Sequence, residues 1–143
     1  MIQVDFYILH TLGGQERERL ACRLADKAWH QGYRIYIQTL SHTHAKQLDD
    51  MLWTFKDISF VPHEIYPDTW SSAPISIGYD TAQVCEGMEV LINLTDIVPP
   101  FFAQFQRIAE LVANKPNARE AGRERYRFYQ KHDNILRVHN IYR

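Results

Sequence analysis

Cysteine and glycine are scarce in this chain of 143 residues, which has two Cys and six Gly. Two cysteines do not make a disulfide framework, and Cys22 and Cys85 lack the spacing of a zinc or thioredoxin site. We expect both to be small buried hydrophobic residues. With 45% hydrophobic and 23% charged residues, the composition excludes a collagen-like, coiled-coil or disordered chain.

Long apolar runs are absent as well. No run approaches the ~18–20 residues that a membrane-spanning helix needs. The first ten residues lack the basic segment and the cleavage site of a signal peptide. We therefore expect a soluble, cytoplasmic protein without a membrane partner, with one domain over residues 1–143 that can bury a sizeable core.

Neither sign of charge dominates, since 16 Lys and Arg face 17 Asp and Glu for a net charge of −1. This balance argues against broad, sequence-independent binding of nucleic acid. The distribution is less even: residues 118–143 contain seven basic and three acidic residues, so this end is positive and the rest is negative. Direct binding of nucleic acid by this end ranks last among the hypotheses, because few aromatic residues accompany the basic ones.

Short apolar runs alternate with amphipathic segments through the first half of the chain. The pattern predicts a strand, a helix, a strand and a helix in turn: Val4–Leu9, 15–31 with Gly32 just after its end, Tyr33–Thr39, and Thr43–Trp53 with Thr43 or Ser41 as N-cap. This order favours right-handed crossovers. The fold class predicted is therefore α/β: a single Rossmann-like domain whose mostly parallel sheet has about five strands and helices on both faces.

The second half is less regular. Prolines break residues 60–80 into a loop with one short strand at Ile75–Tyr79, and 90–94 is strongly strand-like. Pro100 is placed to open a helix through Phe105. Arg107–Ala113 either continues that helix or forms a further strand, whereas a basic helix is predicted from Asn117 or Ala118 to His132.

The motifs of enzymes and cofactor sites do not occur. The segment HTLGGQERER after the first strand is neither a dinucleotide turn nor a phosphate-binding loop, and Glu16 and Glu18 would repel a phosphate. His42 and His44 lie in a loop entering a helix, with no third metal ligand identified, which favours a surface-polar interpretation. We expect no metal, no cofactor and no catalytic residue. The alternative hypothesis, a Rossmann-like protein binding a nucleotide or small molecule, rests on the order of strands and helices alone.

Two segments stand out as candidate binding surfaces. Large apolar residues crowd Leu48–His63, where Trp53 and Phe60 either mark a partner surface or close the core. In the basic helix, Arg119 and Arg123 lie four residues apart with Tyr126 on the same side, which suits a carboxylate or an acidic peptide. The alternative is a solvated helix face with intrahelical ion pairs.

The residues of these segments also carry a family resemblance. LDDMLWTFKDISFVPHEI, APISIGYD, INL followed by a Pro-Phe-Phe segment, and RERYRFY occur in an order and spacing that resembles the chi subunit of bacterial DNA polymerase III. The resemblance spans nearly the whole chain. It implies a Rossmann-like domain without catalytic activity, an adaptor between the psi subunit of the clamp loader and the acidic, Phe-terminated C-terminal tail of single-stranded-DNA-binding protein.

The resemblance also implies roles for particular residues. Trp53 and Phe60 match positions that contribute to the psi interface. Arg119, Arg123 and Tyr126 match residues that hold the tail, and Val112 matches an apolar member of the tail pocket. The same resemblance favours a strand, not a helix, over 107–113.

Overall fold

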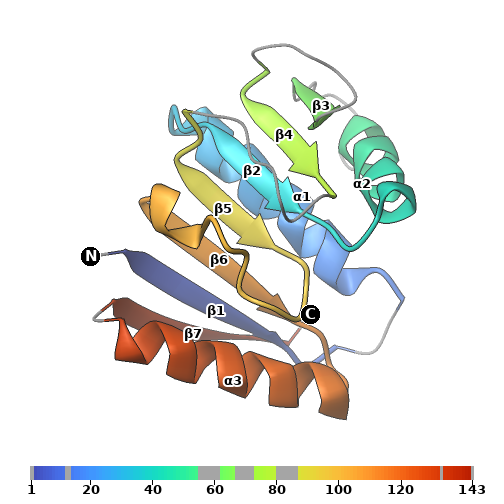
Figure 1. Cartoon of the computed structure of the whole chain (residues 1–143). Helices are drawn as coiled ribbons and strands as arrows, with labels where there is room; N and C mark the ends of the chain where they lie inside the picture. Colours follow the sequence, from blue (N-terminus) through green and yellow to red (C-terminus); the bar gives the residue numbers. More distant parts are fainter. Residues whose placement is uncertain are drawn as a thin grey trace.

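Seven parallel strands form one sheet in the computed structural model, in the order β3-β4-β2-β5-β6-β1-β7 (Figure 1). The structure describes residues 2–11, 14–54, 62–66, 73–79, 87–132 and 134–142. The strands are β1 (Gln3–Leu9), β2 (Ile35–Gln38), β3 (His63–Tyr66), β4 (Ile75–Gly78), β5 (Val90–Asn93), β6 (Arg107–Val112) and β7 (Ile135–Ile141). The helices are α1 (Glu16–His30), α2 (His42–Thr54) and α3 (Pro116–Lys131), with a 3-10 turn, η1, at Phe102–Gln104.

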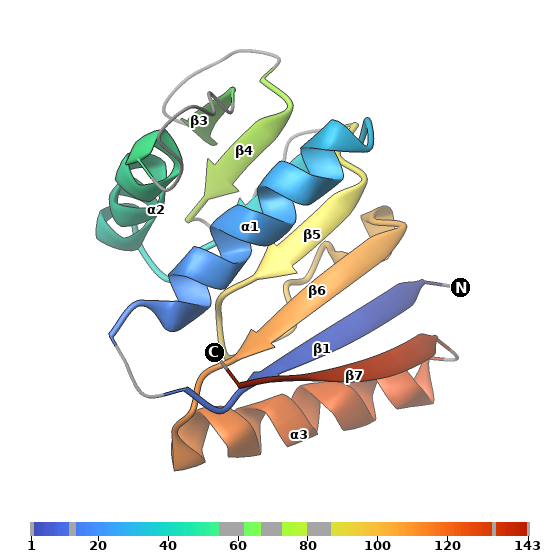
Figure 2. The same ribbon diagram turned by 180° about the vertical axis from the view of Figure 1, so that it is seen from behind.

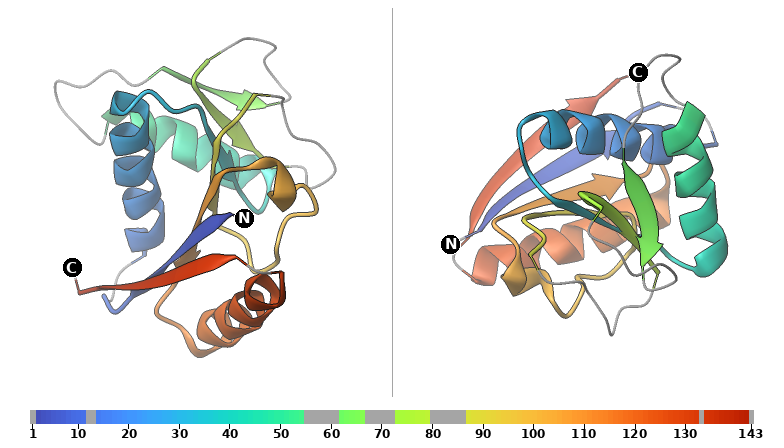
Figure 3. Two further views of the ribbon diagram at one scale, coloured as in Figure 1. Left: turned by 90° about the vertical axis from the view of Figure 1, so that its left-hand side faces the viewer. Right: turned by 90° about the horizontal axis from the view of Figure 1, so that it is seen from above.

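Helices cover both faces of the sheet. Figures 1 and 2 show α1 and α2 on one face, with α3 and η1 on the other, and the edge-on view of Figure 3 separates these layers. Side chains of β1 alternate between two apolar clusters: Val4 and Phe6 pack under α3, whereas Leu9 packs under α1. The predicted α/β class with helices on both faces is confirmed.

Local sequence signals account for the ends of the first two helices. Gly32 follows the end of α1 with φ of +91°, a left-handed conformation that favours glycine, and its N–H donates to the carbonyl of Trp29. At the start of α2, the hydroxyl of Ser41 accepts a hydrogen bond from the backbone N–H of His44 at 3.1 Å. Ser41 is therefore the N-cap among the two candidates.

The sheet has seven strands, not about five, because two short or exposed segments at its edges also pair. β3 lies at one edge, within a segment that prolines made look like a loop, and it pairs with β4 alone. β7 lies at the other edge and pairs with β1 alone. Its side chains are mostly exposed, so the sequence shows little of the apolar alternation typical of a strand.

The helix expected after Pro100 is only the three-residue turn η1. Phe105 has extended backbone angles, φ −102° and ψ 148°, and directs the chain into β6. Phe101 and Phe105 are buried against Tyr36, with ring centroids 5.8 Å and 6.3 Å away. The apolar spacing that favoured a longer helix therefore serves a turn followed by a strand, and 107–112 is β6.

The surface-polar interpretation of His44 is wrong. The side chain is buried: its Nδ1 accepts a hydrogen bond from the backbone N–H of Leu40, and its Nε2 lies 2.9 Å from a carboxylate oxygen of Glu18. It therefore ties the start of α2 to α1. Within the described residues, no group of three or more His, Cys, Asp or Glu could hold a metal ion. None of the helices described is long and apolar enough to cross a membrane.

Candidate functional site

A pocket with a volume of about 160 Å³ opens between α3 and the edge of the sheet formed by β6, β1 and β7. Its apolar walls come from the strands and its basic and aromatic rim from the helix. The lining residues are Phe6, Ile8, Val112 and Val138 from the strands, with Arg119, Gly122, Arg123 and Tyr126 from α3. The structure thus brings the four predicted tail-site residues to one pocket.

Arg119 is held in place in the first turn of α3. Its Nη2 donates to Oδ1 of Asn114 at 2.8 Å and lies 3.3 Å from both the carbonyl oxygen of Leu9 and Nδ1 of His10. These partners come from the ends of β1 and β6. Within the described part of the chain its other guanidinium nitrogens make no hydrogen bond, so they remain available to an anion.

Arg123 is one turn further along α3 and is far more exposed, with 62% of its side chain accessible. It pairs with Glu120 at 3.1 Å, but that carboxylate is 61% exposed. An exposed ion pair in water is weak and easily exchanged. Arg123 can therefore leave Glu120 for an incoming carboxylate, while Arg119 provides a second, fixed guanidinium beside it.

The apolar part of the pocket depends on a close approach of α3 to β6. Gly122 is buried, and a Cβ placed on it would lie 3.0 Å from a methyl carbon of Val112. The absence of a side chain there lets the helix approach the strand and leaves space beside it. Tyr126 closes this space, with its ring centroid 5.3 Å from that of Phe6. The resulting hollow has the size for one side chain and is open to the basic rim.

A buried polar cluster under α3 sets the position of the helix. Glu110 of β6 is fully buried and accepts hydrogen bonds from Arg125 Nε at 2.8 Å, Tyr129 Oη at 2.6 Å and Asn93 Nδ2 at 3.0 Å. Burial raises the pKa of the Glu110 carboxyl, and the charge of Arg125 with these hydrogen bonds opposes that rise. Arg125 and Tyr129 thus face inward, which turns Arg119, Arg123 and Tyr126 toward the pocket.

The buried cluster was not predicted from the sequence. A glutamate inside the apolar segment IAELV is the one local signal for it, because a charged residue within a buried strand needs a partner. The strand residues Phe6, Ile8 and Val138 of the pocket were also missed. They come from β1 and β7, whose pairing joins distant parts of the chain.

The second predicted surface lies at the opposite edge of the sheet. Trp53 is near the end of α2 and 49% exposed, and its ring centroid is 4.8 Å from that of His63 in β3. Figure 1 shows α2 and β3 at one edge of the sheet and α3 and β7 at the other. Phe60, predicted to share this surface, lies outside the described residues, as does Cys85; Cys22 is buried as predicted.

These features define a parallel α/β protein of the Rossmann type with a basic and apolar pocket beside α3. The same fold occurs in the crystal structure of T4 UvsW, with a TM-score of 0.66 and 10% identity over 97% of this chain and 41% of that one. At that identity the likeness concerns the fold alone. Over residues 1–136 the chain matches the family described as "DNA polymerase III chi subunit, HolC", and it belongs to this family.

Individual relatives agree with the family. The chain is 36% identical to the DNA polymerase III subunit chi of Pseudomonas aeruginosa over 141 residues, which are 99% of this chain and 98% of that protein. It is 31% identical to the subunit chi of Haemophilus influenzae, with 86% of each chain covered. It is 28% identical to that of Escherichia coli, with 91% and 92% covered. The chain is therefore similar to replication accessory subunits along almost its full length.

Proposed function

We propose that this chain is a non-catalytic replisome adaptor that binds the acidic C-terminal tail of single-stranded-DNA-binding protein through the α3 pocket and the psi subunit through the surface around Trp53. The observation that carries the first half is the convergence of Val112, Arg119, Arg123 and Tyr126 on one pocket. Membership of the chi family supports both halves.

The chemistry of such a tail fits the α3 pocket. A tail of aspartates ending in Phe presents side-chain carboxylates, a terminal carboxylate and an aromatic ring. Guanidinium groups pair with carboxylates through two parallel hydrogen bonds, and Arg119 and Arg123 offer two of them at the rim. The hollow beside Gly122 takes a ring against Val112 and Tyr126. Specificity then comes from charge and ring together.

A short tail on a single pocket should bind weakly. Because Arg123 is exposed, its contribution is screened by salt. We expect a Kd of about micromolar, on a scale where each 1.4 kcal/mol is tenfold. Several tails on one coat of single-stranded-DNA-binding protein, and a second contact through psi, would raise the effective concentration without any new contact.

The proposal is tested by titrating a fluorescent peptide ending in Asp-Asp-Ile-Pro-Phe against the protein at low and high salt. Wild type should bind, binding should weaken with salt, and Arg123→Ala should lose most of the affinity with its melting temperature unchanged. Arg127→Ala is the matched control, because Arg127 is exposed on the same helix but does not line the pocket. Equal affinity of Arg123→Ala and wild type would refute the site.

The psi half is tested by co-purification of a psi subunit with the chain. Trp53 is half exposed near the end of a helix, so Trp53→Ala should leave the unfolding transition nearly unchanged and remove most of the bound psi. Tail-peptide binding by the same variant should stay at the wild-type level, because the two surfaces lie at opposite edges of the sheet. Retention of psi by Trp53→Ala would exclude this surface.

A further inference from the structure

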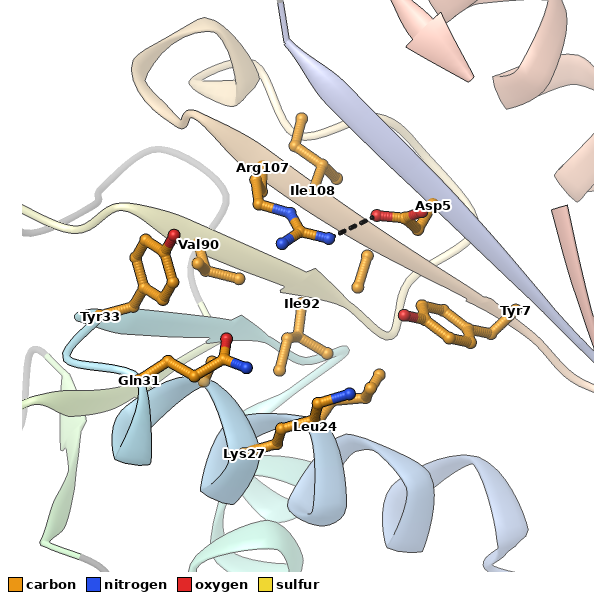
Figure 4. A pocket seen from close by; sticks show the side chains of 12 residues that line it. Asp5, Tyr7, Leu24, Lys27, Gln31, Tyr33, Val90, Ile92, Arg107 and Ile108 are labelled. Carbon is orange, nitrogen blue, oxygen red and sulfur yellow. Dashed lines mark hydrogen bonds and ion pairs between the residues drawn. The ribbon is translucent and has the colours of Figure 1, made fainter. Parts of the chain in front are cut away.

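A second pocket, the α1 groove, lies on the face of the sheet opposite α3 (Figure 4). It has a volume of about 140 Å³ and is bounded by α1 and by strands β1, β5 and β6. Its floor is apolar, formed by Leu24, Ala28, Val90, Ile92 and Ala109. The groove shares no residue with the α3 pocket, so it is a separate site.

Polar groups surround this apolar floor. Figure 4 shows the polar ends of Tyr7, Lys27, Gln31 and Arg107 around the space above Ile92. All four side chains can donate hydrogen bonds. Burial, followed by the charge of Asp5, raises the pKa of the Tyr7 hydroxyl, while Arg107 opposes the rise, so at neutral pH this group is a donor.

The carboxylate of Asp5, which lines the groove, is already engaged. Asp5 is 4% exposed, and its carboxylate receives Arg107 Nη2 at 3.2 Å, Gln3 Nε2 at 3.3 Å and His139 Nε2 at 3.0 Å. The negative charge of Asp5 is therefore already compensated by Arg107, without Lys27. Among the residues that the structure describes, the Lys27 ammonium has no ion pair. The rim therefore keeps the uncompensated positive charge of Lys27 and several hydrogen-bond donors.

We propose that the α1 groove binds a carboxylate with an apolar body the size of one side chain. The body lies on the floor at Ile92, and the carboxylate receives Lys27 and the free N–H groups of Arg107. A rim with two cationic side chains, Lys27 and Arg107, against the one carboxylate of Asp5 over an apolar floor fits this chemistry and disfavours a cation. Two sources present it: a free organic acid, or the C-terminal residue of a peptide. This site is independent of the role proposed for α3.

The probe is 3-phenylpropionate, followed by amide chemical shifts of the full chain. For so small a ligand we expect saturable binding with a Kd on the order of 1 mM, with shifts at Tyr7, Lys27 and Arg107. Lys27→Ala should weaken binding about tenfold, equivalent to about 1.4 kcal/mol. Lys27 is exposed and unpaired in the described chain, so its removal leaves the fold intact; Lys46→Ala, on α2, is the matched control.

Three further arms separate the outcomes. Ala28→Leu fills the groove and should abolish binding, and the neutral 3-phenylpropionamide should bind at least tenfold more weakly than the acid. Arg123→Ala should bind the acid like wild type, which separates this site from the α3 pocket.

Unchanged affinity in Lys27→Ala, or shifts confined to α3, would overturn the proposal. Shifts in the groove when Arg123→Ala meets a Phe-terminated peptide identify a peptide as the source, and shifts with the free acid alone identify a small molecule.

Discussion

Removal of the Arg125 side chain tests the account of how α3 is held. In Arg125→Met, Glu110 stays fully buried but loses the charged partner that lies 2.8 Å away. Breaking a buried ion pair from one side costs about 3–5 kcal/mol of the free energy of unfolding, because the remaining charge is uncompensated. That is a large part of the ~5–15 kcal/mol that keeps a domain folded.

The loss should depend on pH. Burial raises the pKa of Glu110, and Arg125 lowers it, so Arg125→Met raises this pKa further. A carboxyl whose folded-state pKa exceeds its unfolded value of about 4.3 stabilises the folded protein below that value. This stability is lost as pH rises through the folded pKa. The deficit of Arg125→Met relative to wild type should therefore be larger at about pH 7 than at about pH 5.

Urea unfolding of wild type, Arg125→Met, Glu110→Gln and the double variant at both pH values measures these differences. Glu110→Gln keeps the side-chain shape and removes the charge, so the double variant should recover much of the stability lost by Arg125→Met and should lose its pH dependence. A deficit below about 1 kcal/mol, or one equal at both pH values, would show that Glu110 and Arg125 are not a buried pair that fixes α3.

Three further changes have defined outcomes. Gly122→Ala should lower the free energy of unfolding by about 1 kcal/mol, the balance of crowding against higher helix propensity, and should weaken tail binding; an unchanged affinity would show that the hollow is not used. Burial raises the pKa of Cys22 to about 12. In a Cys85→Ser background, the native protein should therefore not react with a thiol reagent at mildly alkaline pH, and rapid reaction would contradict the burial of Cys22. Burial alone would raise the pKa of Glu18, but the hydrogen bond with His44 outweighs it together with smaller effects, so this pKa is lowered. The stability that Glu18 adds is therefore present above its unfolded pKa and is lost as pH falls through the folded pKa. In thermal melts, Glu18→Gln should destabilise the protein near neutral pH and have little effect in acid.

Periodicity predicted the elements that are buried on one or two faces. β1, β2 and β5 are mostly buried, and their apolar runs stand out in the sequence. β7 did not stand out, because Ile135 and Val138 are 45% and 51% exposed and polar residues at 137, 139 and 140 interrupt its apolar ones. A parallel edge strand gains much of its stability from backbone hydrogen bonds, here with β1. Backbone hydrogen bonds do not depend on the order of apolar and polar residues, so the sequence does not reveal them.

The candidate site was predictable where it lies on one helix. Arg119, Arg123 and Tyr126 are four and three residues apart, so helix geometry places them on one side. The other wall of the pocket, with Phe6 and Val138, requires β1 and β7 to be neighbours at the edge beside α3. Local patterns do not specify which strands pair, so this half of the site comes only from the folded chain.

Mapping of the tail peptide on the folded protein tests directly whether the α3 pocket binds it. Amide chemical shifts of the chain, followed while an Asp-Asp-Ile-Pro-Phe peptide is added, report every residue that the peptide approaches. Saturable changes are expected at Val112, Arg119, Gly122, Arg123 and Tyr126, in the walls and rim of the α3 pocket. Saturable changes elsewhere, with these residues unmoved, would contradict binding in the α3 pocket.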